Sequence, residues 1–214
     1  MVRGRKAEGM TLQSRLESSS GKIEERLNAD PQDRLRVLEG RRLVAGLSDP
    51  NSRKRAEVRE KLLALGNAAI PALLAALTDS NGNARWQAAK ALSQIHDPDT
   101  ANDLMNAMEN DDFGVRWLAA EGLIAMGPAS LGAVLQGLIS CFGSIRMREG
   151  ARHVLHALAD GGFHDETIEK LLRTLQGLAP QEEVAWAAEQ AWEKLIVGSL
   201  VRRGDDRERP EGQG

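Results

Sequence analysis

Two histidines spaced three residues apart come nearest to a metal site in this 214-residue sequence. His153 and His156 lie on one predicted helix, so their side chains share one side of it. Glu149 lies one turn earlier, and zinc accepts both imidazole and carboxylate ligands. An exposed helix with two histidines is nevertheless commoner than a metal centre. We therefore expect no bound metal and no cofactor.

The sequence offers no evident nucleophile. Its single cysteine, Cys141, lies in the apolar stretch 138–142, where a packed thiol is expected rather than a reactive one. The Gly-x-Ser-x-Gly, Gly-x-x-x-x-Gly-Lys and Gly-x-Gly-x-x-Gly patterns of hydrolases and nucleotide-binding proteins do not occur. We predict that the protein is not an enzyme.

A third group of side chains is suited to binding. Three of the four tryptophans recur at one position of a repeating pattern, where the fourth repeat has a glutamate, and mostly polar residues follow four positions later. The eight residues of this predicted wall are Trp86, Lys90, Trp117, Glu121, Glu149, His153, Trp186 and Gln190. Tryptophan is enriched at binding hot spots. The alternative is that each indole packs between neighbouring repeats, in which case the side chains are buried.

The pattern that carries these residues is an internal repeat. Arg-Trp-x-Ala-Ala occurs at 85–89 and again, 31 positions later, at 116–120. Three apolar registers extend this match, and steps of three and four residues put them on one face of a helix. The registers are Leu62, Leu92, Leu123, Leu155 and Trp192; Leu65, Ile95, Met126, Leu158 and Leu195; and Val58, Ala88, Ala119, Ala151 and Ala188.

A second apolar helix precedes each of these, and Gly or Pro separates the helices. The composition agrees, because aromatic residues make up only 3% of the chain. We predict an all-α solenoid of about five antiparallel helix pairs, since one pair cannot bury its apolar face alone. The expected units are 34–66, 67–96, 97–127, 128–159 and 160–197.

The two ends of the chain differ from the repeats. The polar segment 1–33 places Leu12, Leu16, Ile23 and Leu27 on one side of a potential helix, which either caps the solenoid or frays. Residues 198–214 are expected to be disordered because they are almost devoid of apolar side chains. No secretory signal or membrane-length apolar run is found, so we expect a soluble, cytoplasmic protein.

The motif Val-Arg-x-x-Ala-Ala-x-x-Leu, followed by Gly-Asp or Gly-Pro, resembles HEAT repeats, and most closely the short type of phycobilisome-lyase-like proteins. The resemblance spans 34–197 and is best at 67–127. It implies that recurrent Asp and Arg residues join neighbouring repeats, here Asp49, Asp79, Arg55, Arg85, Arg116 and Arg148. Ala185 replaces the arginine in the last unit, so we expect that unit to be a variant cap.

Charge is distributed unevenly along the repeats. Residues 34–66 hold nine Lys or Arg and four acids, whereas 97–127 hold seven acids and only Arg116, and 160–197 hold eight acids and three bases. We predict a scaffold that binds a peptide or protein on its concave face. The alternative is nucleic-acid binding by the basic first unit, although phosphates would require basic residues along the whole groove. The weakest alternative, an accessory lyase or chaperone-like subunit, rests on the repeat type.

Overall fold

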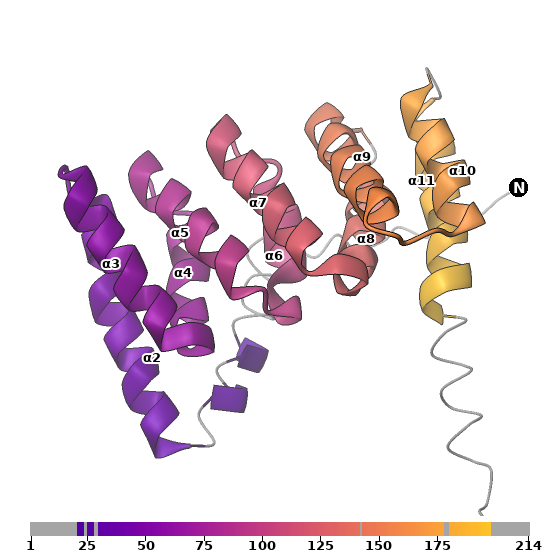
Figure 1. Cartoon of the computed structure of the whole chain (residues 1–214). Coiled ribbons are helices and arrows are strands. Elements are labelled where there is room, and N and C mark those ends of the chain that lie inside the picture. Colours follow the sequence, from indigo (N-terminus) through magenta and orange to yellow (C-terminus); the bar gives the residue numbers. More distant parts are fainter. Residues whose placement is uncertain (1–20, 24, 28–29, 142, 178–179, 198–214) are drawn as a thin grey trace, which may run out of the picture. The chain divides into compact units, whose positions relative to one another are not determined.

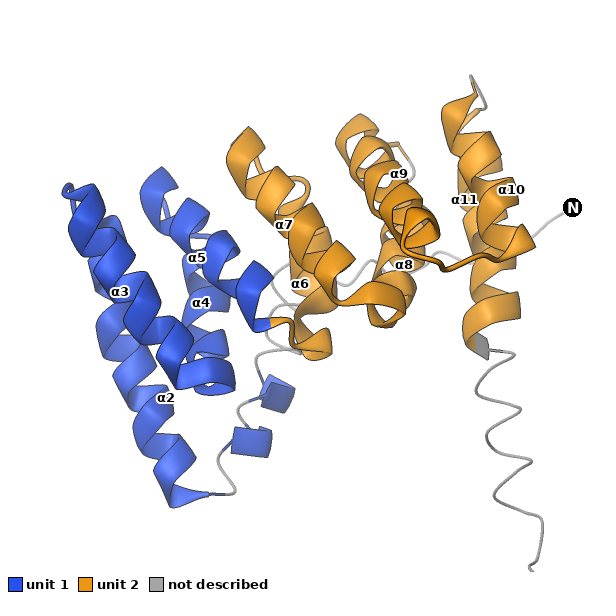
Figure 2. Cartoon of the chain, in the orientation of Figure 1, with its two compact units in different colours: residues 1–95 blue, residues 96–214 orange. Residues whose placement is uncertain are grey.

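The computed structural model describes residues 21–23, 25–27, 30–141, 143–177 and 180–197, and every regular element in them is helical (Figure 1). The predicted all-α solenoid class is confirmed. The chain divides into two compact units, residues 1–95 and residues 96–214 (Figure 2). Most of the predicted N-terminal segment, 1–20, and the predicted disordered tail, 198–214, lie outside the described residues.

Unit 1 contains two helix pairs. Its elements are α2 (Pro31–Leu43), a 3-10 turn (Val44–Ser48), α3 (Ser52–Leu65), a second 3-10 turn (Gly66–Ala69), α4 (Ile70–Ala76) and α5 (Gly82–Ile95). Helix α2 begins at Pro31, where a missing N–H costs nothing, and the Asp30 carboxylate accepts a hydrogen bond from Gln32 N. The first helices α2 and α4 pack together, as do the second helices α3 and α5.

Unit 2 contains three further pairs. Its elements are α6 (Ala101–Ala107), α7 (Phe113–Ala125), α8 (Leu131–Ser140), α9 (Ile145–Asp160), α10 (Glu166–Gln176) and α11 (Gln181–Trp192), with short 3-10 turns at Pro98–Thr100 and Gly127–Ser130 and a π-helical turn at Glu193–Val197. Helices α6 and α8 pack together in one row, and α7 and α9 pack together in the other. This arrangement repeats the one found in unit 1.

The fifth pair departs from that arrangement. Its second helix, α11, packs against α8, whereas its first helix, α10, packs against α9. Figure 1 shows α10 beside α9. The two helices have therefore exchanged rows. Trp186 and Gln190, which lie on α11, do not continue the row of α7 and α9 as the repeat alignment predicted.

Two of the three apolar registers form the core. Leu62, Leu92, Leu123 and Leu155 are fully buried, and so are the four alanines at 88, 119, 151 and 188. The third register is buried at Leu158 and half-buried at its other positions. Small alanines let successive helices approach closely, and the leucines fill the space between them. Ile23 and Leu27, from the predicted N-terminal segment, are also buried.

The recurrent arginines have a different role from the one that the resemblance implied. In the first three pairs, Nη1 of each arginine donates to two backbone carbonyls of the turn before its own helix, at 2.7–3.0 Å. These contacts are Arg55 to Asp49 and Pro50, Arg85 to Asp79 and Ser80, and Arg116 to Asn110 and Asp111. The arginines therefore close their own turns, which leave carbonyls without helical partners. Only Arg148 reaches the next pair, at Gly177 O (2.9 Å) and Thr174 O (3.4 Å).

Candidate functional site

The eight residues of the predicted wall lie on α5 in unit 1 and on α7, α9 and α11 in unit 2. In unit 1, Trp86 is half-buried and Lys90, one turn later on α5, places its Nζ 4.9 Å from the indole centroid. In unit 2, Trp117 and Glu121 on α7 contact His153 on α9, the helix that also carries Glu149. Trp186 and Gln190 lie elsewhere in unit 2, on α11. Within unit 2, Trp117 on α7 and Trp186 on α11 therefore do not share one local site.

The contact between α7 and α9 centres on Trp117 and His153. Their rings stack with centroids 5.0 Å apart and an interplanar angle of 28°. His153 Nε2 also lies 3.5 Å from Glu121 Oε1, a distance that favours an ion pair when the imidazole is protonated but is long for a hydrogen bond. Trp117 remains 48% exposed. The ring thus joins two neighbouring pairs and still presents surface to solvent.

Two exposed apolar residues extend this group. Phe113 and Ile145 are the first residues of α7 and α9, and they are 69% and 71% exposed. Phe113 stacks on Trp117 with centroids 6.4 Å apart. Each lies four residues before a predicted wall position, Trp117 or Glu149. That helical spacing was visible in the sequence, although the alignment of repeats did not single these residues out.

We call the six residues of this group the α7–α9 surface: Phe113, Trp117, Glu121, Ile145, Glu149 and His153. Both helices begin at the same end of their pairs. One turn before the Trp117–His153 contact, α7 therefore carries Phe113 and α9 carries Glu149. The surface combines exposed apolar side chains with two carboxylates.

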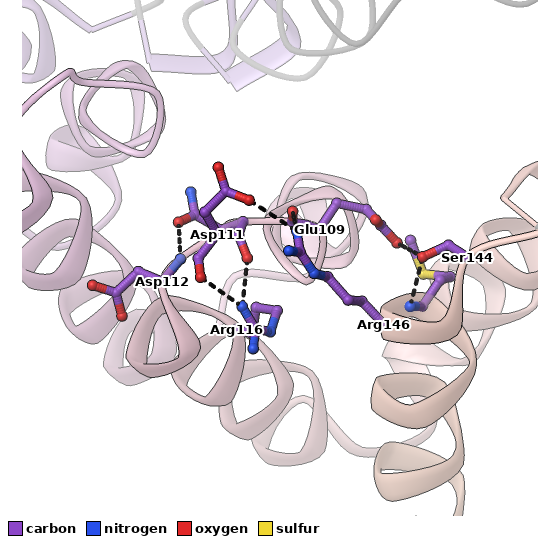
Figure 3. Close-up of polar contacts among 8 residues, drawn as sticks. Glu109, Asp111, Asp112, Arg116, Ser144 and Arg146 are labelled. Atoms are coloured by element: carbon purple, nitrogen blue, oxygen red, sulfur yellow. Dashed lines mark hydrogen bonds and ion pairs between the residues drawn. The ribbon is translucent and has the colours of Figure 1, made fainter.

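A polar network fixes the starts of the two helices relative to each other (Figure 3). Ser144, the N-cap of α9, accepts a hydrogen bond from Met147 N and donates its own hydroxyl proton to the Glu109 carboxylate. Arg146 Nη1 donates to Glu109 O at 3.0 Å and to Asp111 Oδ1 at 3.1 Å. Because Glu109 and Asp111 belong to the turn before α7, the network links the start of α9, where Ile145 lies, to the start of α7, where Phe113 lies.

A depression lies between α10 and α11. It measures about 550 Å³ and is lined by Trp186, Gln190, two lysines and two glutamates among other residues. Lys170 Nζ lies 5.6 Å from the Trp186 ring. Lys170 therefore covers part of the Trp186 ring, and the two lysines of the lining balance its two glutamates.

Asp165, the N-cap of α10, lies near this depression. Burial alone would raise the pKa of its carboxyl group. Hydrogen bonds from Thr167 and from the Ile168 N–H, together with the positive charge of Lys194, outweigh burial and hold the pKa below its usual value. The hydrogen bond from Thr167 N to Oδ1 is 2.7 Å long.

The two histidines on α9 do not converge as their spacing suggested. His153 turns to Glu121 on α7, whereas His156 Nε2 lies 2.9 Å from Gln176 Nε2 at the end of α10. The imidazoles thus contact neighbours on different helix pairs. Within the described residues, no three His, Cys, Asp or Glu side chains are grouped to hold a metal ion. Cys141 is half-buried.

Several basic side chains of unit 1 have partners within the chain. Arg55 closes its own turn, as described above. Arg59 is largely buried and donates to Gln87 Oε1 and Glu60 Oε1, both at 2.8 Å. Lys54 lies 3.8 Å from Asp49. These side chains are therefore not all available to phosphates.

Residues 40–124 match the family model described as HEAT repeats. The match supports a HEAT-repeat protein and covers the helices from the end of α2 to α7. It does not reach α8 to α11, where the fifth pair departs from the pattern. No curated protein matches the chain. None of the helices in the described part of the chain is long and apolar enough to cross a membrane.

Proposed function

We propose that the protein is a non-catalytic scaffold that binds a protein partner through the α7–α9 surface. HEAT repeats commonly serve as protein-interaction scaffolds. The observation that carries the proposal is the exposure of Phe113, Trp117 and Ile145 on two neighbouring helices. Large apolar side chains gathered at one place on a surface are typical of interaction sites.

Direct contacts between α7 and α9 support the proposal. Ser144 and Arg146 connect α9 to the turn before α7, and the Trp117–His153 stack connects the two helices one turn further along. Side chains held in place lose little conformational entropy when a partner binds, so more of the contact energy contributes to affinity. Aromatic side chains in such positions are frequent hot spots.

Affinity capture from the native host tests the proposal. The bait is the full chain, compared with a Phe113→Ser/Trp117→Ala variant. The matched control is Leu35→Ser/Leu38→Ser, which removes two exposed apolar side chains from α2 in unit 1. We expect a protein that wild type and the control retain and the first variant loses. Equal retention by all three baits would contradict binding through the α7–α9 surface.

The proposal also includes the type of HEAT repeat. The short HEAT repeats of phycobilisome-lyase-like proteins share the Val-Arg-x-x-Ala-Ala spacing, which this chain follows at Val115 and Arg116. The proposal assigns the chain that repeat type and no lyase chemistry. We further propose that it acts in the cytoplasm, in keeping with a single cysteine.

A further inference from the structure

Three exposed or half-exposed aromatic rings of this chain carry a cation of the chain itself. Lys90 lies over Trp86 at 4.9 Å, Arg116 over Phe113 at 5.5 Å, and Lys170 over Trp186 at 5.6 Å. Each distance is within the range of a cation–π interaction. In the part of the chain that the structure describes, no Lys or Arg lies over the Trp117 ring. Trp117 is nevertheless 48% exposed.

The carboxylates around Trp117 would favour a cation there. Glu121 lies one turn after Trp117, and its side chain is 43% exposed. Glu149 is exposed on α9 at the level of Phe113. Glu121 pairs with His153 at 3.5 Å, and imidazole is charged only when protonated. Glu121 and Glu149 thus bring two negative charges to the surface, against the one positive charge of the Arg116 guanidinium over Phe113.

The net charge of residues 96–197, which span the described part of unit 2, has the same sign. Residues 96–197 contain 16 Asp or Glu and seven Lys or Arg, a net charge of −9 with neutral histidines. Two of these arginines, Arg116 and Arg148, donate to backbone carbonyls, and Arg146 pairs with Asp111. The field of unit 2 attracts basic partners and repels phosphates.

From these observations, and on the basis of the proposed function, we infer that the partner presents a basic, partly apolar peptide segment. An Arg or Lys of that segment contacts the part of the Trp117 ring that Phe113 and His153 leave exposed, near Glu121 and Glu149. Apolar side chains of the segment contact Phe113 and Ile145, which are too exposed to contribute to the core. Acidic segments and nucleic acids are disfavoured, because their negative charges would face these carboxylates.

Synthetic peptides test this inference directly. The probes are three labelled twelve-residue peptides in which leucine alternates with arginine, glutamine or glutamate, titrated with the full chain by fluorescence anisotropy. We expect the arginine peptide to bind about tenfold more tightly than the glutamine peptide, since a cation–π contact and two partly screened charge pairs add up to roughly that factor. The glutamate peptide is expected to bind least.

Variants that neutralise carboxylates test whether the preference for the arginine peptide arises at the α7–α9 surface. Glu121→Gln/Glu149→Gln should reduce the preference for arginine over glutamine about fivefold or more. The matched control is Glu169→Gln/Glu189→Gln, which removes two exposed carboxylates from α10 and α11 and should retain the preference. An equal loss in both variants would show that only the overall charge matters and would overturn the inference.

The remaining outcomes separate the inference from the proposed function. If the arginine and glutamine peptides bind equally and both depend on Trp117, the surface binds peptides without selecting a cation; the inference then fails while the proposed function stands. If no peptide binds with dependence on Trp117 at about 100 µM, weaker than typical transient recognition, the inference also fails. The capture experiment then decides the proposed function alone.

Discussion

The indole of Trp117 lies against the imidazole of His153, with the ring centroids 5.0 Å apart and the ring planes at 28°. The two side chains belong to successive helix pairs, α7 and α9, so the stack is an inter-repeat contact. Both side chains also remain partly exposed. The binding and packing roles that the sequence presented as alternatives are thus compatible at Trp117.

The stack should contribute measurably to stability. A double-mutant cycle of Trp117→Ala and His153→Ala is expected to give a coupling free energy of about 0.5–1 kcal/mol, the range for stacked aromatic pairs, in urea unfolding. The control cycle pairs Trp117→Ala with Glu182→Ala at the start of α11 and should give no coupling. A value near zero for Trp117 and His153 would show that the contact does not hold the pairs together.

The arginines that close their own turns provide a second prediction. Arg85→Gln removes hydrogen bonds to the carbonyls of Asp79 and Ser80 and should lower the free energy of unfolding by about 1 kcal/mol, because these bonds are partly solvated. Arg53→Gln, an exposed substitution near the start of α3, is the control and should change stability by less than about 0.5 kcal/mol. Equal effects would argue against a specific role for Arg85.

Two glycines of α8 should respond differently to alanine. A Cβ at Gly137 would lie 2.4 Å and 2.7 Å from the Cε and Cγ of Met105, and 3.1 Å from the Sδ of Met147. Gly137→Ala should therefore destabilise the protein by about 1–3 kcal/mol despite the gain in helix propensity. At Gly132 the nearest atom is 3.6 Å away, on Trp192, so Gly132→Ala should be neutral or stabilising. Thermal unfolding of both variants checks the difference.

Acid should weaken the cap of α10. The folded-state pKa of Asp165 is lowered, so its contribution to stability is fully present above the unfolded value, near pH 4, and is lost as the pH falls through the lower folded value. Asp165→Asn and Asp165→Ser keep a neutral cap. The stability gap between wild type and each variant, measured by urea unfolding from pH 7 to pH 3, should shrink with acidification. A constant gap would contradict a charge effect at Asp165.

The sequence was sufficient to predict the helix pairs and most of the core. The leucines at 62, 92, 123 and 155 are buried where the registers placed them, because a step of 3.6 residues ties spacing directly to one helical face. The role of Arg85 was not predictable in the same way. Its partners are backbone carbonyls, and no sequence pattern distinguishes the carbonyls of its own turn from those of a neighbouring repeat.

The arrangement of the eight residues of the predicted wall was also predicted only in part, because spacing does not show which helices pack together. Trp186 occupies the same register as Trp117, but registers describe a helix and not the row in which that helix packs. An amphipathic helix can pack its apolar face against α8 as readily as against α9. The spacing of apolar residues along α10 and α11 therefore does not reveal that these helices have exchanged rows. Phe113 and Ile145 were missed because they are the first residues of their helices. The corresponding positions of the other repeats carry different residue types, so the alignment shows no pattern there.

Site-specific photocrosslinking in the native host tests binding at the α7–α9 surface most directly. A benzoylphenylalanine placed at Trp117, and in a second variant at Ile145, reports which proteins touch these positions. The same probe at Leu35, which is 69% exposed on α2, is the matched control. We predict one crosslinked partner shared by positions 117 and 145 and absent at position 35. Crosslinks that are equal at all three positions, or confined to position 35, would contradict a binding site on α7 and α9.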